Sequence, residues 1–193
     1  MVTLNRIYTR TGDDGTSALA TGERRPKSDL RFAAIGTVDE ANAHVGLARI
    51  YSRSPDGDFS AEFDAMLSRI QNDLFDLGAD LATPEKIGKR ERLRISAHQV
   101  ERLEREIDAL NQRLRPLTSF VLPGGNPAAA ALHLCRTVAR RAERLIVELV
   151  ARETVNPEAV HYINRLSDFF FVAARVINDD GAADVLWVPG QNR

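Results

Sequence analysis

Residues 126–153 read NPAAAALHLCRTVARRAERLIVELVARE, and this stretch decides the class of fold. It opens with Asn126 and Pro127, which place a capping side chain before a proline at the first helical position. Behind them, apolar residues recur at steps of three and four, the spacing that gives an α-helix one apolar face. The stretch therefore predicts a long amphipathic helix over about 127–153.

The rest of the chain carries similar helical signals. Asn156-Pro157 repeats the asparagine–proline start and predicts a last helix over about 157–178. Residues 60–81 carry apolar side chains at helical spacing, after a turn expected at 54–58. The helices from residue 127 onward are the most apolar, so we expect them at the centre of the fold.

Two capping boxes, in which Ser or Thr is followed three residues later by Glu or Gln, predict two more helix starts. The first is Thr37-Val38-Asp39-Glu40, which predicts a helix from there to about Arg53. The second is Ser96-Ala97-His98-Gln99. The apolar stripe behind this second box consists of Val100, Leu103, Ile107, Leu110 and Leu114.

Five amphipathic helices with almost no strand pattern predict an all-α fold, a five-helix bundle formed by one domain over residues 1–193. The helical part is expected over 36–180. Residues 1–35 are rich in Gly, Asp, Thr, Arg and Lys, and we expect an irregular polar loop there rather than a packed element. Residues 181–193 are expected to form a C-terminal tail.

The composition is that of an ordinary folded protein, with 44% hydrophobic residues, 27% charged residues and a net charge of −1. Such a balance produces no global positive field, so we expect no nucleic-acid partner. The single cysteine, Cys135, excludes an internal disulfide and fits a reducing compartment. No run approaches the ~18 apolar residues of a membrane helix, and the N-terminus resembles neither a signal peptide nor a transit peptide. We therefore expect a cytoplasmic protein, or a mature protein whose leader has been removed, with no membrane partner.

The first motif with chemical potential is YTRTGDDGTS at residues 8–17. Gly12 and Gly15 permit a tight curl whose N–H groups and hydroxyls suit phosphate oxygens, and Arg10 and Lys27 add cationic contacts. The motif is not a Walker A loop, because no Gly-Lys-Ser/Thr follows and no strand precedes it. Its aspartates also lack the spacing of a calcium-binding EF-hand. Taken alone, such a motif is more often a simple turn.

The second motif lies on the helix that begins at Pro127. His133, Arg136, Arg140 and Glu143 follow one another at steps of three and four, so they share one face. Arginines hold phosphate groups bidentately, and a buried arginine needs a partner, so the face is a candidate polyanion site. A solvated or interfacial salt-bridge face is the commoner interpretation of this pattern by itself.

The third motif lies on the last helix, where Asn164 and Asp168 are four residues apart among aromatic side chains. Polar groups in such surroundings need partners, which are either structural or part of a ligand. The run Phe169-Phe170-Phe171 is more typical of a core than of a cofactor surface.

Two other patterns are weak candidates for chemistry. Glu158 and His161 have the spacing of a di-iron bundle motif, but the sequence contains one copy where two are needed. Cys135 and His133 lie two residues apart on a helix and so face different directions, which makes them poor metal or catalytic partners. We expect Cys135 to serve packing.

Taken together and in order, four stretches resemble the PduO-type ATP:cob(I)alamin adenosyltransferases. The resemblance covers nearly the whole chain. It departs at TSALATGERRPK, where extra polar residues separate the glycine turn from Lys27. The four stretches are YTRTGDDGTSAL with the lysine of RRPK, GTVDEANAHVGLAR, FVLPGGNPAAAALHLCRTVARRAERL and NRLSDFFFVAAR.

The resemblance implies a homotrimer of five-helix bundles with ATP, accompanied by Mg²⁺, bound between adjacent subunits. It implies that Phe120 displaces the lower axial ligand of the corrinoid, with Asp168 nearby. It also implies that Arg136, a catalytic residue with Arg140, pairs with Asp39 of a neighbouring subunit. The implied ATP contacts are Thr9, Arg10, Thr11, Gly12, Ser17, Ala18 and Lys27 of the loop, and Arg140, Arg141, Glu143, Arg144 and Asn164 of the helices.

The implied reaction transfers the 5′-deoxyadenosyl group of ATP to the cobalt of cob(I)alamin. Cob(I)alamin is itself a strong nucleophile, which agrees with the absence of any Ser-His-Asp or Cys-His pattern in the sequence. The protein then has to align carbon with cobalt and neutralise the departing triphosphate. Candidates for the neutralisation are Lys27, Arg10, Arg140 and Mg²⁺.

Two other functions compete with this one. The first is a carrier or regulatory module that binds ATP or corrinoid without turnover. The second is a structural helical interaction protein, which leaves the glycine–aspartate loop and the arginine face unexplained. For the enzyme, an electron-donating reductase and an adenosylcobalamin-dependent enzyme are the expected protein partners.

Overall fold

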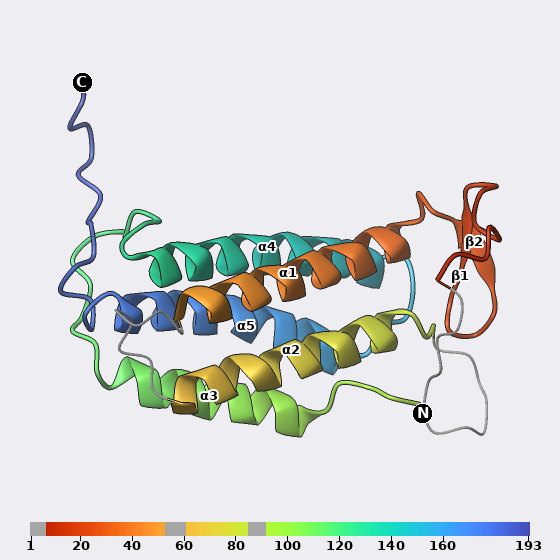
Figure 1. Ribbon diagram of the computed structural model, residues 1–193, viewed down its shortest axis with the longest axis horizontal. Helices are drawn as coiled ribbons and strands as arrows, with labels where there is room; N and C mark the ends of the chain where they lie inside the picture. The colour runs from red at the N-terminus through yellow and green to blue at the C-terminus, as the bar shows by residue number, and fades with distance from the viewer. Residues whose placement is uncertain (1–6, 53–60, 85–91) are drawn as a thin grey trace.

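Long antiparallel helices, stabilised by one continuous apolar core, make up most of the molecule in the computed structural model, which describes residues 7–52, 61–84 and 92–193 (Figure 1). The predicted all-α bundle is confirmed in the described part of the chain. The helices are α1 (Leu30–Ser52), α2 (Ala61–Leu81), α3 (Ala97–Asn111), α4 (Pro127–Val150) and α5 (Pro157–Ile177).

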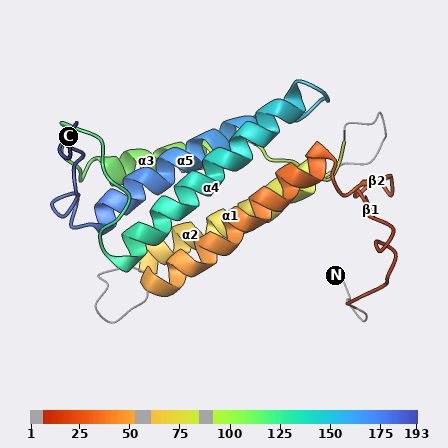
Figure 2. The same ribbon diagram turned by 90° about the horizontal axis from the view of Figure 1, so that it is seen from above.

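Helix α5 packs against α4 and α3, while α1 packs against α4 and α2 (Figures 1 and 2). The Phe169 ring of α5 stacks on Phe63 of α2 with 6.3 Å between centroids. The buried Tyr162 hydroxyl donates a 2.8 Å hydrogen bond to Asp73 of α2. The predicted central position of the apolar last helix is thus confirmed, and α4 packs directly against it.

The asparagine–proline starts of α4 and α5 are confirmed by their geometry. The Asn126 side chain accepts a hydrogen bond from the Ala129 N–H at 2.9 Å, and the Asn156 side chain accepts one from the Glu158 N–H at 3.1 Å. At the start of α3, Gln99 reaches back and accepts a hydrogen bond from the Ser96 N–H at 2.9 Å. The turn expected at 54–58 lies outside the described residues.

The predicted start of the first helix was wrong. Helix α1 begins seven residues earlier than the capping box at Thr37, because Asp29 caps it: the Asp29 carboxylate accepts the Arg31 N–H at 2.8 Å. The Thr37 hydroxyl instead donates to the Ala33 carbonyl inside the helix, at 2.8 Å. A long buried stripe that starts at Ala34 continues the helix through the predicted boundary.

The prediction that residues 1–35 form a loop without packed elements was also wrong. Strands β1 (Thr16–Ala18) and β2 (Arg24–Pro26) pair antiparallel, and Leu19 between them is buried. Glu153, which follows α4, forms an ion pair with Arg25 of β2 at 2.7 Å. It forms a second ion pair, also at 2.7 Å, with the fully buried Arg31 of α1, so the hairpin is joined to the bundle. Burial opposes ionisation of Glu153, but the hydrogen bonds from both arginines outweigh it and lower the pKa of the carboxyl.

The two ends of the bundle carry different irregular segments. The β1–β2 hairpin lies at one end, where α1 and α5 begin, while the loop between α3 and α4 meets the C-terminal segment at the other end (Figure 1). At that second end, Val121 and Leu186 form an isolated antiparallel bridge. Within the described residues, no helix is long and apolar enough to cross a membrane.

Candidate functional site

A polar face lies along the contact between α4 and α5, and it contains five of the predicted site residues. Asn164 of α5 donates a 2.7 Å hydrogen bond to Glu143 of α4, which joins the two helices in the middle of the face. Asp168 lies one turn further along α5 and is exposed. We call this set the α4–α5 face; its members are Arg136, Arg140, Glu143, Asn164 and Asp168.

Two buried polar atoms beside this face have no hydrogen-bond partner within the described structure. They are Nε of Arg136 and Nδ1 of His133, whose ring packs edge-on against Phe171. Burial and the neighbouring charge of Arg140 lower the pKa of Arg136. Burial and the charge of Arg136 likewise lower the pKa of His133. The guanidinium of Arg136 is therefore partly desolvated, and Nε of Arg136 has no hydrogen-bond partner in the described structure.

The arginines of α4 divide into two groups. Arg141 pairs with Glu40 of α1, so its charge is satisfied within the chain. Among the described residues, Arg136 and Arg140 form no ion pair, and Arg144 only donates to the Arg140 carbonyl at 3.1 Å. Arginines without an ion pair on a partly exposed face favour an anionic ligand or a partner carboxylate.

The surroundings of the Asp168 carboxyl raise its pKa above the ordinary value. Partial burial of the carboxyl is the main cause, and the negative charge of Glu143 adds to it. The positive charges of Arg165 and Arg140 lower the pKa and offset part of this rise. Arg165 lies 4.0 Å away and is held by Glu104 at 2.8 Å. Asp168 therefore lies within electrostatic reach of both Arg140 and Arg165.

The predicted phosphate loop forms a tight curl at the hairpin end. Gly15 adopts a positive φ of 81°, and the Gly15 N–H donates to the Gly12 carbonyl at 3.2 Å. At Gly12, a Cβ atom would lie 3.1 Å from Nζ of Lys27, so glycine lets the ammonium group approach the curl. The predicted curl and its lysine are therefore brought together.

Other predicted loop residues surround this curl. Arg10 has a positive φ of 61°, and its guanidinium lies 5.7 Å from the centre of the Tyr8 ring. The hydroxyls of Thr9 and Thr11 share a 2.9 Å hydrogen bond. Ser17 and Ala18 lie on strand β1 rather than in the irregular loop.

The predicted site residues fall into three groups within one chain. Those of residues 9–27 lie at the hairpin end, the α4–α5 face lies along the bundle, and Phe120 lies in the loop at the opposite end. No hydrogen bond or ion pair of the described chain joins the loop residues Thr9 to Ala18, or Lys27, to the α4–α5 face. Asp39 is exposed on α1 and forms no ion pair in the described structure.

Phe120 projects into solvent beside the C-terminal segment. The residue is 77% exposed, and the centre of its ring lies 6.0 Å from that of the Trp187 ring. A large exposed aromatic ring on a hydrogen-bonded loop is typical of a contact surface. Sequence reasoning identified Phe120 but missed Trp187, although it is the only tryptophan of the chain.

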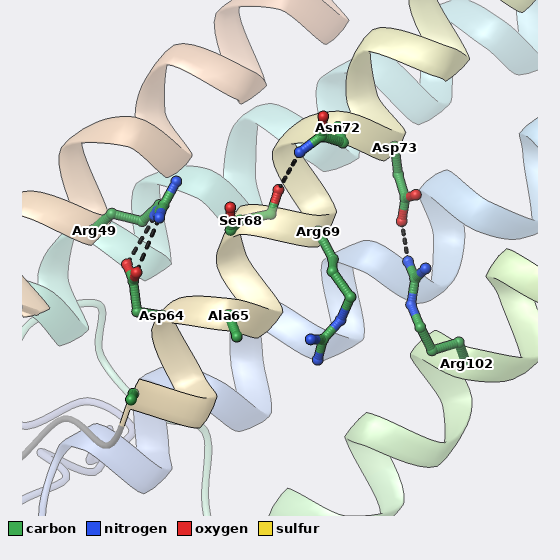
Figure 3. Close-up of a pocket in the computed structure, with 9 residues that line it drawn as sticks. Arg49, Asp64, Ala65, Ser68, Arg69, Asn72, Asp73 and Arg102 are labelled. Carbon is green, nitrogen blue, oxygen red and sulfur yellow. Dashed lines mark hydrogen bonds and ion pairs between the residues drawn. The ribbon is translucent and has the colours of Figure 1, made fainter.

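A separate open hollow of about 550 Å³ lies between α1, α2 and α3, and contains none of the predicted site residues (Figure 3). It is also rich in arginine, but each guanidinium is paired. Arg49 binds Asp64 at 2.8 Å, and Arg69 binds Glu106 at 2.6 Å. Arg102 binds Asp73. The hollow's residues are Arg49, Ala61, Asp64, Ala65, Ser68, Arg69, Asn72, Asp73 and Arg102.

The weak candidates from the sequence have structural explanations. Cys135 is buried, and burial raises its pKa to about 12, which keeps the thiol protonated and inert. His161 lies 3.4 Å from Glu158 on an exposed helix surface. Over the described residues, no group of three or more His, Cys, Asp or Glu side chains is arranged to hold a metal ion.

The fold and this face define a class: a helical bundle with a desolvated cationic surface suited to a polyanion. A sequence family described as cobalamin adenosyltransferase matches residues 7–177. The corrinoid adenosyltransferase of Mycobacterium tuberculosis is 48% identical, with 100% of this chain and 97% of that protein covered. That of Bacillus subtilis is 42% identical, with 93% and 91% covered.

Solved structures agree with these sequence relatives. A variant of the PduO-type ATP:corrinoid adenosyltransferase from Lactobacillus reuteri, complexed with cobalamin and ATP, matches with a TM-score of 0.86. The two are 38% identical, and the match covers 95% of this chain and 97% of that chain. The chain belongs to the cobalamin adenosyltransferase family, and its resemblance to the PduO type is confirmed.

Proposed function

We propose that this chain transfers the 5′-deoxyadenosyl group of ATP to the cobalt of cob(I)alamin, forming adenosylcobalamin and releasing triphosphate. The observation that carries the proposal is the cationic α4–α5 face, where Arg140 lies beside Arg136 and forms no ion pair in the described structure. Triphosphate is the most highly charged species of this reaction, and guanidinium groups bind phosphate oxygens through charge-assisted hydrogen bonds. The L. reuteri relative, solved with cobalamin and ATP, supports both substrates.

The chemistry requires alignment and charge neutralisation from the protein rather than a nucleophile. The cobalt attacks C5′ of the ribose and forms the Co–C bond, while the C5′–O bond breaks and its electron pair leaves with the triphosphate. Negative charge therefore grows on the phosphate oxygens in the transition state. Preorganised donors such as Arg140 and Lys27 stabilise that charge without reorganising at the moment of reaction.

ATP is proposed to lie between adjacent subunits of a homotrimer, held by the N-terminal loop of one subunit and the α4–α5 face of the next. The separation of these two regions within one chain supports this arrangement. The unpaired Arg136 Nε and the exposed Asp39 support a pair formed across the subunit boundary. The loop contacts are those implied for Thr9, Arg10, Thr11, Gly12, Ser17, Ala18 and Lys27, and the helix contacts those of Arg140, Arg141, Glu143, Arg144 and Asn164.

Mg²⁺ is proposed to enter with ATP. The α4–α5 face carries two carboxylates, Glu143 and Asp168, and Glu143 already accepts a hydrogen bond from Asn164. These two groups are too few to form a complete protein cage for the ion, so the phosphates of ATP would supply the other ligands. Mg²⁺ is commonly held by substrate phosphates, water and one or two carboxylates rather than by a protein cage. When bound, the ion neutralises part of the triphosphate charge.

The corrinoid is proposed to bind at the end of the bundle that carries Phe120, with Asp168 near it. An exposed phenyl ring suits the lower face of the corrinoid because it occupies the space of the axial ligand without donating electrons. Loss of that ligand favours the reduced, lower-coordinate cobalt. The 77% exposure of Phe120 supports a role in contact rather than in the core.

The wider setting follows from this chemistry. Cob(I)alamin must be supplied by an electron-donating reductase, and the product serves an adenosylcobalamin-dependent enzyme. A single domain over residues 1–193, located in the cytoplasm, is part of the same proposal. The reductase and the enzyme that consumes the product are the expected protein partners.

The proposal is tested by incubating the protein with ATP, Mg²⁺ and chemically reduced cobalamin and following the absorption spectrum of the adenosylated product. Multiple turnovers are expected from the wild type. The matched control is Arg49→Ala, whose arginine is paired with Asp64 outside the α4–α5 face and is not expected to affect turnover. Binding of ATP and corrinoid without product would replace the enzyme by a carrier or regulatory module, and no binding of either would leave a structural protein.

A further inference from the structure

The loop that carries Phe120 is fixed along its length by the C-terminal segment. The Trp187 N–H donates to the Phe120 carbonyl at 2.8 Å, and the Leu122 N–H donates to the Val185 carbonyl at 2.8 Å. The Ser119 hydroxyl donates to the Trp187 carbonyl at 2.7 Å. Phe120 thus has an exposed ring on a backbone that is held on both sides.

The C-terminal segment is itself anchored by a buried ion pair. Nε of Arg175, near the end of α5, donates to Asp184 at 2.8 Å, and the two side chains are only 8% and 3% exposed. The Asn178 amide donates to the other oxygen of Asp184 at 3.1 Å. Both carboxylate oxygens of Asp184 are therefore used, directly before the chain turns into Val185–Trp187.

The same polar cluster also holds the Phe120 loop at both of its ends. Before Phe120, Nη2 of Arg175 donates to the Arg115 carbonyl at 3.1 Å. After Phe120, the Asn126 N–H donates to the Asn178 side-chain oxygen at 3.4 Å. Gly125 is required there, because its φ is +98° and a Cβ atom would lie 2.4 Å from that oxygen.

A buried ion pair contributes little to stability compared with an apolar pair of the same volume, but it fixes direction and spacing. Arg175, Asn178 and Asp184 hold two segments that are distant in sequence, and Phe120 lies where these segments meet. No member of the cluster is among the residues proposed to touch ATP or corrinoid. Their hydrogen bonds point inward, to the loop and the C-terminal segment.

We infer that Asp184, held by Arg175 and Asn178, is a positioning residue that sets the Phe120 ring at the place of the corrinoid's lower ligand. The inference rests on the proposed function of Phe120. A ring displaced by about 1 Å loses much of its effect, since misplacement on that scale costs up to about 100-fold in rate. The cluster acts only on the step in which the lower ligand is removed.

The test compares two corrinoid substrates in the full-length protein. Asp184→Asn preserves shape but removes the charge that holds Arg175. Starting from cob(II)alamin and a reductant, we expect turnover to fall by at least about tenfold, as for a displaced reacting group. Starting from cob(I)alamin reduced beforehand, where the lower ligand is already absent, we expect a rate within about twofold of the wild type and an unchanged Kd for ATP. A purely structural role would lower both rates together, and equal losses would overturn the inference.

Trp187 supplies an optical readout, because it is the only tryptophan and its ring faces Phe120. Its fluorescence is expected to change in Asp184→Asn.

The matched control is Asp180→Asn, which breaks an exposed pair with Arg113 (2.9 Å) near the same end of α5 and should change neither rate. If Asp184→Asn does not fold, Ser119→Ala is the alternative, because it removes one exposed hydrogen bond to the C-terminal segment. It should also lower the rate with cob(II)alamin more than the rate with cob(I)alamin, but by a smaller factor. Absence of this difference would also overturn the inference.

Phe120→Ala separates this inference from the proposal on which it rests. One outcome is that Phe120→Ala lowers the rate with cob(II)alamin more than the rate with cob(I)alamin while Asp184→Asn does not. In that case the positioning role of Asp184 fails, and the function of Phe120 stands. If Phe120→Ala shows no such difference between the two rates, the proposed role of the ring fails first. If the wild type forms no adenosylated product from either substrate, the proposed reaction itself is wrong.

Discussion

The α4–α5 face and the hollow between α1, α2 and α3 are both rich in arginine, yet they differ in how their charges are compensated. In the hollow, each guanidinium faces a carboxylate: Arg49 with Asp64, for example, or Arg102 with Asp73 (Figure 3). On the face, Arg136 and Arg140 form no ion pair within the described structure. The arginines of the hollow are thus neutralised by carboxylates of the same chain, while Arg136 and Arg140 have no such ion-pair partner in the described structure.

This difference shows that the number of arginines does not locate a polyanion site. A paired arginine has already recovered its desolvation penalty from its neighbour, so an incoming phosphate gains little there. An unpaired and partly buried arginine recovers that penalty only from a ligand or from a partner subunit. The following substitutions test this contrast.

The largest expected effect is on catalysis and concerns Arg140. Arg140→Ala removes a preorganised donor to the departing triphosphate and should cost about 2–4 kcal/mol of transition-state stabilisation, a loss of about 30- to 1000-fold in kcat/KM. Steady-state kinetics with cob(I)alamin and ATP measure it. Arg49→Ala in the hollow is the matched control, with kcat/KM expected to stay near that of the wild type. Similar losses for both variants would contradict the contrast.

The next effect is on stability and concerns the hollow. Asp73→Ala leaves the Tyr162 hydroxyl and the Arg102 guanidinium without their shared acceptor, and should lower the free energy of unfolding by about 2–3 kcal/mol. Denaturant unfolding followed by circular dichroism measures the loss. Asp168→Ala on the α4–α5 face is the comparison and should change stability much less. A loss for Asp73→Ala no greater than that for Asp168→Ala would mean that the pairs in the hollow are not holding the helices.

A smaller effect is expected at the subunit boundary. Asp39→Ala removes the carboxylate proposed to compensate Arg136 of the neighbouring subunit. We expect weaker trimer assembly or a loss of about tenfold in turnover, equivalent to about 1.4 kcal/mol. Sedimentation velocity and kinetics are the two measurements, with Asp108→Ala, an exposed carboxylate on α3, as the control. Unchanged sedimentation and unchanged kinetics would remove the proposed pair.

The smallest effect is a pH dependence of stability due to His133. Burial, with the charge of Arg136, lowers its pKa below the ordinary value of 6.5, so the unfolded chain takes up the proton first as the pH falls. The contribution of His133 to stability is therefore full above about pH 6.5 and declines below it. His133→Gln should reduce the decline measured by denaturant unfolding between pH 7 and pH 5. His98→Gln, at an exposed position, should not reduce it, and equal slopes for wild type and His133→Gln would contradict the assignment.

Much of the architecture was predictable because its signals are local. The starts of α4 and α5 depend on Asn126 and Asn156 acting on their own next residues, and the apolar stripes depend on a helical period of a few residues. The start of α1 was mispredicted because two local signals compete, the capping box at Thr37 and the cap at Asp29. The buried positions of Arg31 and Ala34 decide between them, and that burial comes from other segments.

The candidate site was predictable only in part. The shared face of Arg136 and Arg140 follows from helical spacing, and Phe120 follows from the resemblance to the family. The Arg175–Asp184 pair and the position of Trp187 carry no local signal, because each depends on two segments that meet only in the folded chain.

The amino-acid sequence by itself determined the helices, their apolar faces and the residue types available for phosphate chemistry, since these depend on neighbours within a few positions. Only the tertiary structure decided which arginines are neutralised and which are left for a ligand. It also decided that the Phe120 loop is held by the C-terminal segment. The physical reason is that desolvation and pairing of charges depend on distances between elements far apart in the chain, which no local pattern specifies.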